Sequence, residues 1–219
     1  MPADAQPLRY PDRVLVDGPS DARTTLVLAH GAGGPMDSPF LDAVARDLAA
    51  RGVRVARFEF PYMARRREEG RRTALDRQPV LLASWRETVE RLGGGRSLVI
   101  GGKSLGGRMA SLLADELEAR GLVCLGYPFH PPRKPERLRT EHLGPMRTPT
   151  LIVQGTRDPF GGPEEVGGYR LSPAIRVVWI EDGDHDLRPR ARSGRSAEQN
   201  LDEALDAVAA FLGEIEGAR

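Results

Sequence analysis

Six apolar runs of strand length recur along the 219-residue chain, and they constrain its fold more than any other feature. Each run is nearly continuous in apolar residues, which is typical of strands covered on both faces, as in parallel sheets. Amphipathic stretches between several of them can form the helical crossovers that parallel strands need. The sequence therefore predicts an α/β fold with a doubly wound, mostly parallel sheet flanked by helices. The runs are TLVLAH from Thr25, VRVARFEF from Val53, SLVIGG from Ser97, LVCLGY from Leu122, TLIVQG from Thr150 and IRVVWIE from Ile175.

Helix signals stand between these runs. Ser38 is a candidate N-cap, and Pro39 would occupy the first position of the helix that follows. The predicted helices run from Ser38 to Gly52, from Pro79 to the glycines at 93–95, from Leu105 to Arg120 and from Asn200 to Ile215. The stretch RYPDRVLVDG, from Arg9, alternates more and predicts an antiparallel edge strand or hairpin.

Length and charge narrow the function classes. A chain of this length can bury about 70% of the surface that it exposes when unfolded, so we expect a single domain over residues 1–219. The net charge is +1, from 32 basic and 31 acidic residues, which indicates neither a nucleic-acid partner nor an anionic membrane. No apolar stretch has the length of a membrane span or a signal peptide, so we expect a cytoplasmic protein.

Two smaller features have plain structural interpretations. Cys124 is the only cysteine, and its apolar neighbours predict a small buried side chain. The arginine-rich segment RRREEGRR, Arg65–Arg72, predicts a solvated loop whose charges partly cancel; recognition of an anionic substrate there is the open alternative.

The stretch GGKSLGG, which surrounds Ser104, lies where a predicted strand ends and a predicted helix begins. It contains the pattern G-x-S-x-G, in which a serine occupies a sharp strand-to-helix turn and exposes its hydroxyl at the carboxyl end of the sheet. Gly102 and Gly106 are explained because side chains there would prevent the close approach of strand and helix. The sequence therefore predicts that Ser104 is a nucleophile.

A serine hydroxyl needs a base and a group that orients this base. His185 follows the last predicted strand and is the candidate base; Asp158 follows the preceding strand and is the candidate acid. Three carboxylates lie nearer to His185 in sequence: Asp182, Asp184 and Asp186. They rank second as candidate acids, because a carboxylate beside the histidine cannot easily face its ring across a loop. Asp184 or Asp186 is expected to shape the loop.

Negative charge that develops in the reaction needs hydrogen-bond donors. The loop HGAGG follows a strand, and the N–H of Ala32, together with that of Leu105, is predicted to form an oxyanion hole. His30 is expected to brace this loop by hydrogen bonds. The loop lacks the spacing of a nucleotide-binding motif, and the sequence implies no metal or organic cofactor.

The order Ser104, Asp158, His185, behind an H-G-x-G-G loop, resembles the α/β-hydrolase superfamily. The segments HGAGGPMDSPF, GGKSLGGRMAS, LGYPFHPP and GTRDPFG are most similar to its small lidless branch, which includes dienelactone hydrolases and bacterial relatives of a testis-expressed and a histone-acetyltransferase-complex hydrolase-like protein. The resemblance implies that Ser104 is the nucleophile, Asp158 the acid and His185 the base, with Ala32 and Leu105 as oxyanion donors. Dienelactone hydrolase proper has a cysteine nucleophile where this chain has Ser104.

Only about 22 residues, Pro128–Pro149, separate two strands at the place where lid domains of this superfamily usually stand. This segment is too short for a multi-helix lid and predicts a proline-stiffened rim. Phe129 and His130 in it are expected either to touch substrate or to pack the rim onto the sheet.

The resulting hypothesis is a serine hydrolase that cleaves small, accessible carboxylic esters or thioesters through an acyl-enzyme. Two alternatives stay open: a non-catalytic protein-interaction module on the same fold, and an acyltransferase or perhydrolase in which the acceptor is not water. The sequence does not indicate an oligomeric state.

Overall fold

A seven-stranded sheet forms the centre of the computed structural model, which describes residues 14–218. All six apolar runs form strands of this sheet, and these strands, β2 to β7, are parallel to one another, as predicted. The strand order is β1-β3-β2-β4-β5-β6-β7. The strands are β1 (Val14–Asp17), β2 (Thr25–Ala29), β3 (Arg54–Phe58), β4 (Leu98–Lys103), β5 (Gly121–Leu125), β6 (Thr150–Gly155) and β7 (Ile175–Ile180).

The first strand is the antiparallel one. β1 pairs with β3 from Val14 opposite Phe58 to Asp17 opposite Val55, so the prediction of an antiparallel edge strand is confirmed for this part. Residues 9–13, the first part of the predicted segment, lie outside the described residues.

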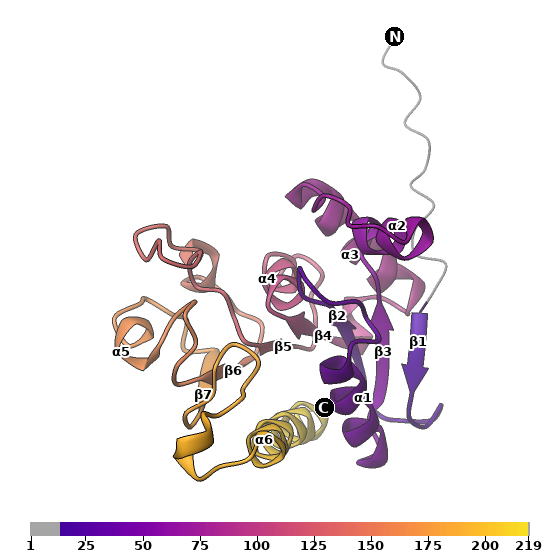
Figure 1. Ribbon diagram of the computed structural model, residues 1–219. Helices are drawn as coiled ribbons and strands as arrows, with labels where there is room; N and C mark the ends of the chain where they lie inside the picture. Colours follow the sequence, from indigo (N-terminus) through magenta and orange to yellow (C-terminus); the bar gives the residue numbers. More distant parts are fainter. Residues whose placement is uncertain (1–13, 219) are drawn as a thin grey trace.

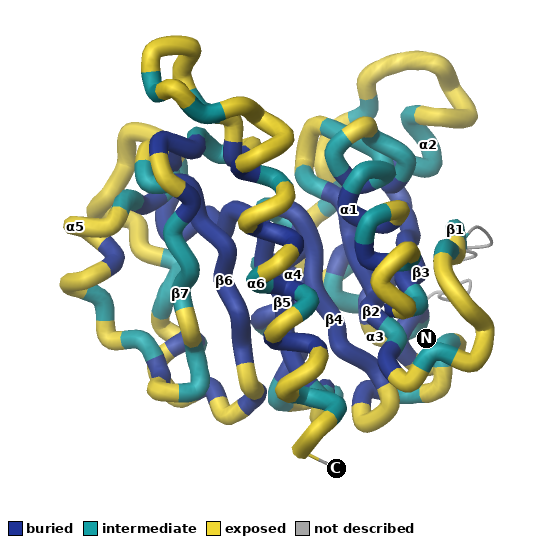
Figure 2. The backbone as a smooth tube through the Cα atoms, turned by 90° about the horizontal axis from the view of Figure 1, so that it is seen from below, coloured by how far each residue is buried: buried dark blue, intermediate teal, exposed yellow. Residues whose placement is uncertain are grey.

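Helices cover both faces of the sheet (Figure 1). Along β2, Leu26 and Leu28 belong to the core beneath α1 and α6, whereas Val27 packs with α3 and α4 on the other face. This alternation is the period of two of a strand that is buried on both sides. Figure 2 shows the strands as the buried centre between helices with exposed outer turns. The helices are α1 (Pro39–Ala50), α2 (Pro61–Glu69), α3 (Gln78–Arg91), α4 (Leu105–Ser111), α5 (Pro163–Val166) and α6 (Ala197–Gly217).

The third predicted helix is wrong in length. α4 ends at Ser111, and turns lead from there to β5. The spacing of the hydrogen bonds changes from residue to residue in this stretch: Leu117 N–H bonds Leu113, four residues back, and Ala119 N–H bonds Ala114, five back. Glu118 has φ 51°, which a regular helix excludes.

Two other boundaries also differ from the prediction. α6 begins at Ala197 because Ser196 and Gln199 form a capping box, in which each side chain bonds the other's backbone N–H. The arginine-rich segment 65–72 is not all loop: residues 65–69 belong to α2, and Gly70, which follows the helix, has a left-handed conformation. Arg65 bonds Asp76 and Arg67 bonds Glu59, so carboxylates match these two charges.

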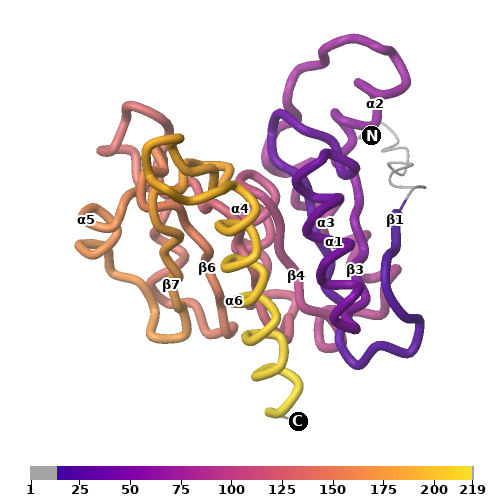
Figure 3. The backbone as a smooth tube through the Cα atoms, turned by 60° about the horizontal axis from the view of Figure 1, so that its bottom comes forward, coloured from indigo at the N-terminus to yellow at the C-terminus, as the bar shows by residue number. Residues whose placement is uncertain are grey.

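The loops that follow β2, β4, β6 and β7 meet at one edge of the sheet, the upper end in Figure 3. The rim, residues 128–149, contains only the short 3-10 helix Glu141–Leu143, which confirms that no large lid is present. Within residues 14–218, no helix has both the length and the apolar character that crossing a membrane requires.

Candidate active site

Ser104 occupies a strained turn between β4 and α4. Its backbone has φ 51° and ψ −111°, outside the regions that residues with a side chain favour. Such a conformation costs on the order of 1–3 kcal/mol and persists only where the surroundings enforce it. The Ser104 N–H donates to the Leu125 carbonyl at 3.0 Å, which fixes the turn to the end of β5.

The two glycines of G-x-S-x-G are required by the close approach of β2. A Cβ at Gly102 or at Gly106 would lie 2.2 Å from the carbonyl oxygen of Ala29. No side chain fits at that distance from backbone. A Cβ at Gly102 would also lie 3.0 Å from the backbone of α4, as predicted, whereas at Gly106 the close contact is with β2 and not with the strand before Ser104.

The structure brings the three predicted side chains together at the carboxyl edge of the sheet. His185 Nε2 lies 2.8 Å from Ser104 Oγ, and His185 Nδ1 lies 2.8 Å from Asp158 Oδ2. The Asp158 side chain is fully buried. Because an ionised carboxylate only accepts hydrogen bonds, Nδ1 carries the proton and Nε2 is left to accept the Ser104 hydroxyl. This arrangement can deprotonate the serine.

Phe160 contacts both Asp158 and His185, and it was not among the residues predicted from the sequence. Its backbone N–H donates to Asp158 Oδ1 at 2.9 Å, which closes a turn two residues after the acid. Its ring lies against the His185 ring, with the centroids 4.3 Å apart. The aspartate–proline–aromatic sequence after the turn was the available signal.

The three carboxylates ranked second have other partners. Asp182 bonds Arg190, which holds the pKa of that carboxyl below its usual value. Asp184 accepts the N–H groups of Asp186 and Arg188 and so shapes the loop, as expected. Asp186 pairs with Lys103.

The HGAGG loop lies directly against Ser104. A Cβ at Gly31 would be 3.7 Å from the Ser104 Cβ. His30 braces the loop as predicted: Nδ1 donates to the Gly31 carbonyl at 2.7 Å, and Nε2 accepts the Phe60 N–H at 3.0 Å. Burial lowers the pKa of His30 to about 4, so the ring is neutral near pH 7.

The two expected oxyanion donors have suitable backbone positions. The Gly31 carbonyl is held by His30 and by the Tyr62 hydroxyl at 3.2 Å, and in a planar trans peptide the Ala32 N–H points away from that carbonyl. Leu105 is the first residue of α4, where N–H groups have no partner within the helix. Among residues 14–218, neither N–H group has a hydrogen-bond partner.

A cavity of about 460 Å³ opens at Ser104. Ala32, Phe40 and Phe160 are among the residues that line it, together with His185 and Lys103. This size is in the range of pockets for small molecules.

Phe129 and His130 do not line the Ser104 cavity. Phe129 is fully buried against Tyr127 and Tyr169, and His130 Nε2 contacts Glu165 at 3.2 Å. Both side chains pack the rim onto the body of the protein, the other role that the sequence left open.

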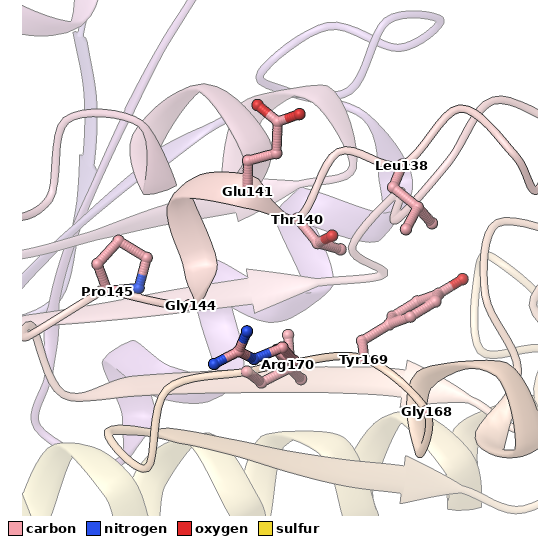
Figure 4. Close-up of a pocket in the computed structure, with 9 residues that line it drawn as sticks. Leu138, Thr140, Glu141, Gly144, Pro145, Gly168, Tyr169 and Arg170 are labelled. Carbon is pink, nitrogen blue, oxygen red and sulfur yellow. The ribbon is translucent and has the colours of Figure 1, made fainter.

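A larger groove, of about 740 Å³, lies between the rim and the segment before β7 (Figure 4). Leu138 and Tyr169 are among its lining residues, and it shares none of them with the Ser104 cavity. Its lining contains no serine, cysteine or histidine. Within residues 14–218, no group of three or more His, Cys, Asp or Glu is arranged to hold a metal ion.

Solved structures share this fold at low sequence identity. A serine hydrolase without a lid from Xanthomonas campestris is 20% identical, with a TM-score of 0.67 over 92% of this chain and 88% of that chain. Dienelactone hydrolase from Anabaena variabilis is 20% identical, with a TM-score of 0.70 over 92% and 90%. Est1E from Butyrivibrio proteoclasticus, with ferulic acid bound, is 16% identical, with a TM-score of 0.71 over 94% and 96%.

A family model agrees with these likenesses in fold. The model for the alpha/beta hydrolase domain matches residues 22–213. This range includes β2 to β7 and the positions Ser104, Asp158 and His185. The chain is therefore a member of the alpha/beta hydrolase family.

Proposed function

We propose that the protein is a serine hydrolase that cleaves small, accessible carboxylic esters or thioesters through an acyl-enzyme. The observation that carries this proposal is the continuous hydrogen-bonded chain from Asp158 through His185 to Ser104, with both links at 2.8 Å. Membership of the alpha/beta hydrolase family supports it. Est1E, which shares the fold, has been seen with ferulic acid, a carboxylic acid, bound.

In the first half of the reaction, Ser104 Oγ attacks the ester carbonyl carbon while His185 Nε2 takes the hydroxyl proton. Asp158 stabilises the imidazolium that forms. The carbonyl oxygen becomes an oxyanion, which accepts hydrogen bonds from the N–H groups of Ala32 and Leu105. Collapse of this intermediate expels the alcohol or thiol, which receives the proton from Nε2 and leaves an acyl group on Ser104.

In the second half, water replaces the leaving group. His185 Nε2 takes a proton from the water, whose oxygen attacks the acyl carbon, and the oxyanion again rests on the two N–H groups. The acid is released when Ser104 Oγ leaves and recovers its proton. The open cavity admits water because no large lid covers it.

A fluorophosphonate reagent and p-nitrophenyl acetate test the proposal together. Wild type is expected to be labelled and to turn over, whereas Ser104→Ala loses both. Ser20→Ala is the matched control, since Ser20 is exposed and remote in sequence from the three triad positions. Absence of both labelling and turnover in wild type would contradict the proposal and favour the non-catalytic interaction module.

Competition between water and added acceptors separates hydrolysis from transfer. Alcohols and hydrogen peroxide are supplied at increasing concentration, and the products are quantified. A hydrolase is expected to release mainly the free acid at every concentration. Predominant transfer at low acceptor concentration would instead identify an acyltransferase or perhydrolase.

A further inference from the structure

Lys103 stands immediately before the nucleophile, and its ammonium group is buried. It is the last residue of β4, and its side chain is only 10% exposed. Burial lowers the pKa of this amine, and Asp186 opposes the effect. A charge withdrawn from water is costly unless polar partners surround it, so the contacts of this ammonium group define what the residue does.

These contacts lead to the loop that carries the base. Lys103 Nζ donates to the backbone carbonyl of His185 at 2.6 Å and lies 3.2 Å from Asp186 Oδ1. On another side, the ammonium lies 5.7 Å from the centre of the Phe40 ring, within cation–π range. The Lys103 side chain thus connects β4, directly before Ser104, with the backbone of His185, the proposed base.

Gly126, just after β5, keeps the space for this connection open. A Cβ there would lie 2.9 Å from the His185 carbonyl oxygen, 3.1 Å from Lys103 Nζ and 3.2 Å from His185 Nδ1. Gly126 also has φ 70°, which glycine adopts without strain. Lysine, histidine and glycine therefore fit together as one packed unit behind the reacting atoms.

The His185 ring is bonded through its two nitrogens, to Ser104 and to Asp158, whereas the Lys103 bond acts on the backbone carbonyl of the same residue. The 182–190 loop is closed internally by Asp184. The Arg157 N–H holds the Gly183 carbonyl and Asn200 holds the Leu187 carbonyl, and the Lys103 bond holds the His185 carbonyl between these two points. A displacement of about 1 Å at a reacting group can lower the rate about 100-fold. The position of the loop therefore matters to the chemistry.

We propose that Lys103 is a positioning residue, which holds the backbone of His185 at a fixed distance from Ser104. It does not touch the reacting atoms, and the proposal rests on the proposed hydrolase function. Lys103 is the first variable position of G-x-S-x-G, so the proposal assigns this position a role in placing the histidine.

Lys103→Met tests the proposal, because methionine keeps much of the apolar stem and removes the ammonium. Asp186 is 56% exposed on its side chain, so water can solvate it in the variant. We expect kcat for p-nitrophenyl acetate to fall about 10- to 100-fold with KM changed less than about threefold, as for an interaction that serves the transition state. Lys134→Met, which alters the exposed second lysine, is the matched control.

Chemical rescue separates positioning from a general loss of structure. In Lys103→Cys, 2-bromoethylamine alkylates the new thiolate with loss of bromide and restores an ammonium on a chain of nearly lysine length. Cys124 is 1% exposed, and burial raises the pKa of its thiol, so it does not compete. We expect aminoethylation to restore kcat at least tenfold relative to the unmodified variant. A wild-type kcat in Lys103→Met, or no recovery after aminoethylation, would overturn the proposal.

Amide hydrogen exchange tests the proposal independently of turnover. The N–H groups of Asp184, Asp186, Leu187 and Arg188 are all bonded inside the loop, so their exchange reports its order. We expect faster exchange at these positions in Lys103→Met than in wild type or Lys134→Met; unchanged exchange would overturn the positioning role. Inactive wild type would refute the hydrolase function alone, because the exchange comparison still decides the role of Lys103.

Discussion

The two carboxylate oxygens of Asp158 bind different partners, the His185 ring and the Phe160 backbone. Oδ2 accepts the His185 Nδ1–H and Oδ1 accepts the Phe160 N–H, so each oxygen fixes a different part of the site. In Asp158→Asn the amide can present its NH₂ group to Nδ1, which selects the wrong imidazole tautomer. We expect kcat to fall by about 10³- to 10⁴-fold, as for other triads with this change.

Asp182→Asn is the control for this residue, because it changes another buried carboxylate, in the neighbouring loop after β7. Asp182 bonds Arg190 and lies near Arg157, so its loss is expected to lower the thermal midpoint while kcat changes less than about tenfold. Steady-state kinetics on both variants decides the assignment. A larger loss of kcat in Asp182→Asn than in Asp158→Asn would contradict it.

His30 predicts how stability depends on pH. Its Nε2 accepts the Phe60 N–H, and burial lowers its pKa from 6.5 to about 4. Between these values the unfolded chain binds the proton and the folded chain does not, so the stabilisation is complete above pH 6.5 and is lost as the pH falls toward 4. This difference in pKa corresponds to roughly 3 kcal/mol.

Urea unfolding of wild type and His30→Gln at several pH values between 4 and 7.5 measures this effect. Glutamine keeps an acceptor for the Phe60 N–H but does not titrate. We expect the free energy of unfolding to fall with pH more steeply in wild type than in the variant. Parallel curves would show that His30 does not cause the dependence.

Residue types at strand ends were enough to predict which side chains meet at Ser104, because a parallel sheet collects the loops after its strands at one edge. The catalytic roles of these residues stay predictions until activity is measured. Phe129 and His130 could not be placed in the same way. Whether a rim side chain faces a cavity or the core depends on contacts such as that of Phe129 with Tyr169, which sequence spacing does not encode.

At the scale of elements, the crossing of β2 and α4 makes a quantitative prediction about Gly106. Its added Cβ would meet the Ala29 carbonyl oxygen at 2.2 Å and the His30 carbonyl oxygen at 2.8 Å. These are backbone atoms, which cannot rotate away as a side chain can. We expect Gly106→Ala to lower the free energy of unfolding by about 3 kcal/mol or more, in the range of overpacking a rigid site.

Gly213→Ala provides the opposite control within a helix. Gly213 lies in α6, where an added Cβ meets nothing within 4 Å. Alanine there is expected to stabilise the protein by about 0.5–1 kcal/mol, because it restricts the unfolded chain and favours the helix. Urea unfolding of both variants checks the pair; equal effects would show that the approach of β2 to α4 is not what selects glycine.

Element boundaries were less predictable than element types. Apolar runs are long and local, so all six strands could be identified from sequence. The end of α4 depends instead on tertiary contacts: Asp115 accepts the N–H groups of Arg147 and Thr148, which draws the chain away from a regular helix. The start of α6 was readable, because Ser196 and Gln199 have capping-box spacing, but the apolar periodicity alone placed it later.

At the scale of the whole molecule, the strand order explains why the site lies where it does. From β2 the chain crosses to β3 on one side, and from β4 it crosses to β5 on the other. The loops after β2 and β4 therefore diverge, and open α/β sheets bind ligands in the crevice at such a reversal. The HGAGG loop and Ser104 flank this crevice, so the predicted nucleophile and the predicted oxyanion donors lie close together as a consequence of topology.

The same architecture predicts which esters react fastest. Each CH₂ group that is buried on binding contributes about 0.8 kcal/mol to the binding free energy. The value of kcat/KM therefore rises with acyl length only as long as each added carbon contacts apolar residues of the cavity. The cavity at Ser104 holds about 460 Å³ and has Phe40, Leu41 and Phe160 in its lining, and the rim adds no helical lid that could cover a longer chain. We therefore expect kcat/KM for p-nitrophenyl esters to rise from acetate to butyrate and to be lower for octanoate and laurate. The measurement uses monomeric substrate, with Ser104→Ala as the blank; a value that keeps rising through laurate would mean that long acyl chains bind along a surface outside this cavity.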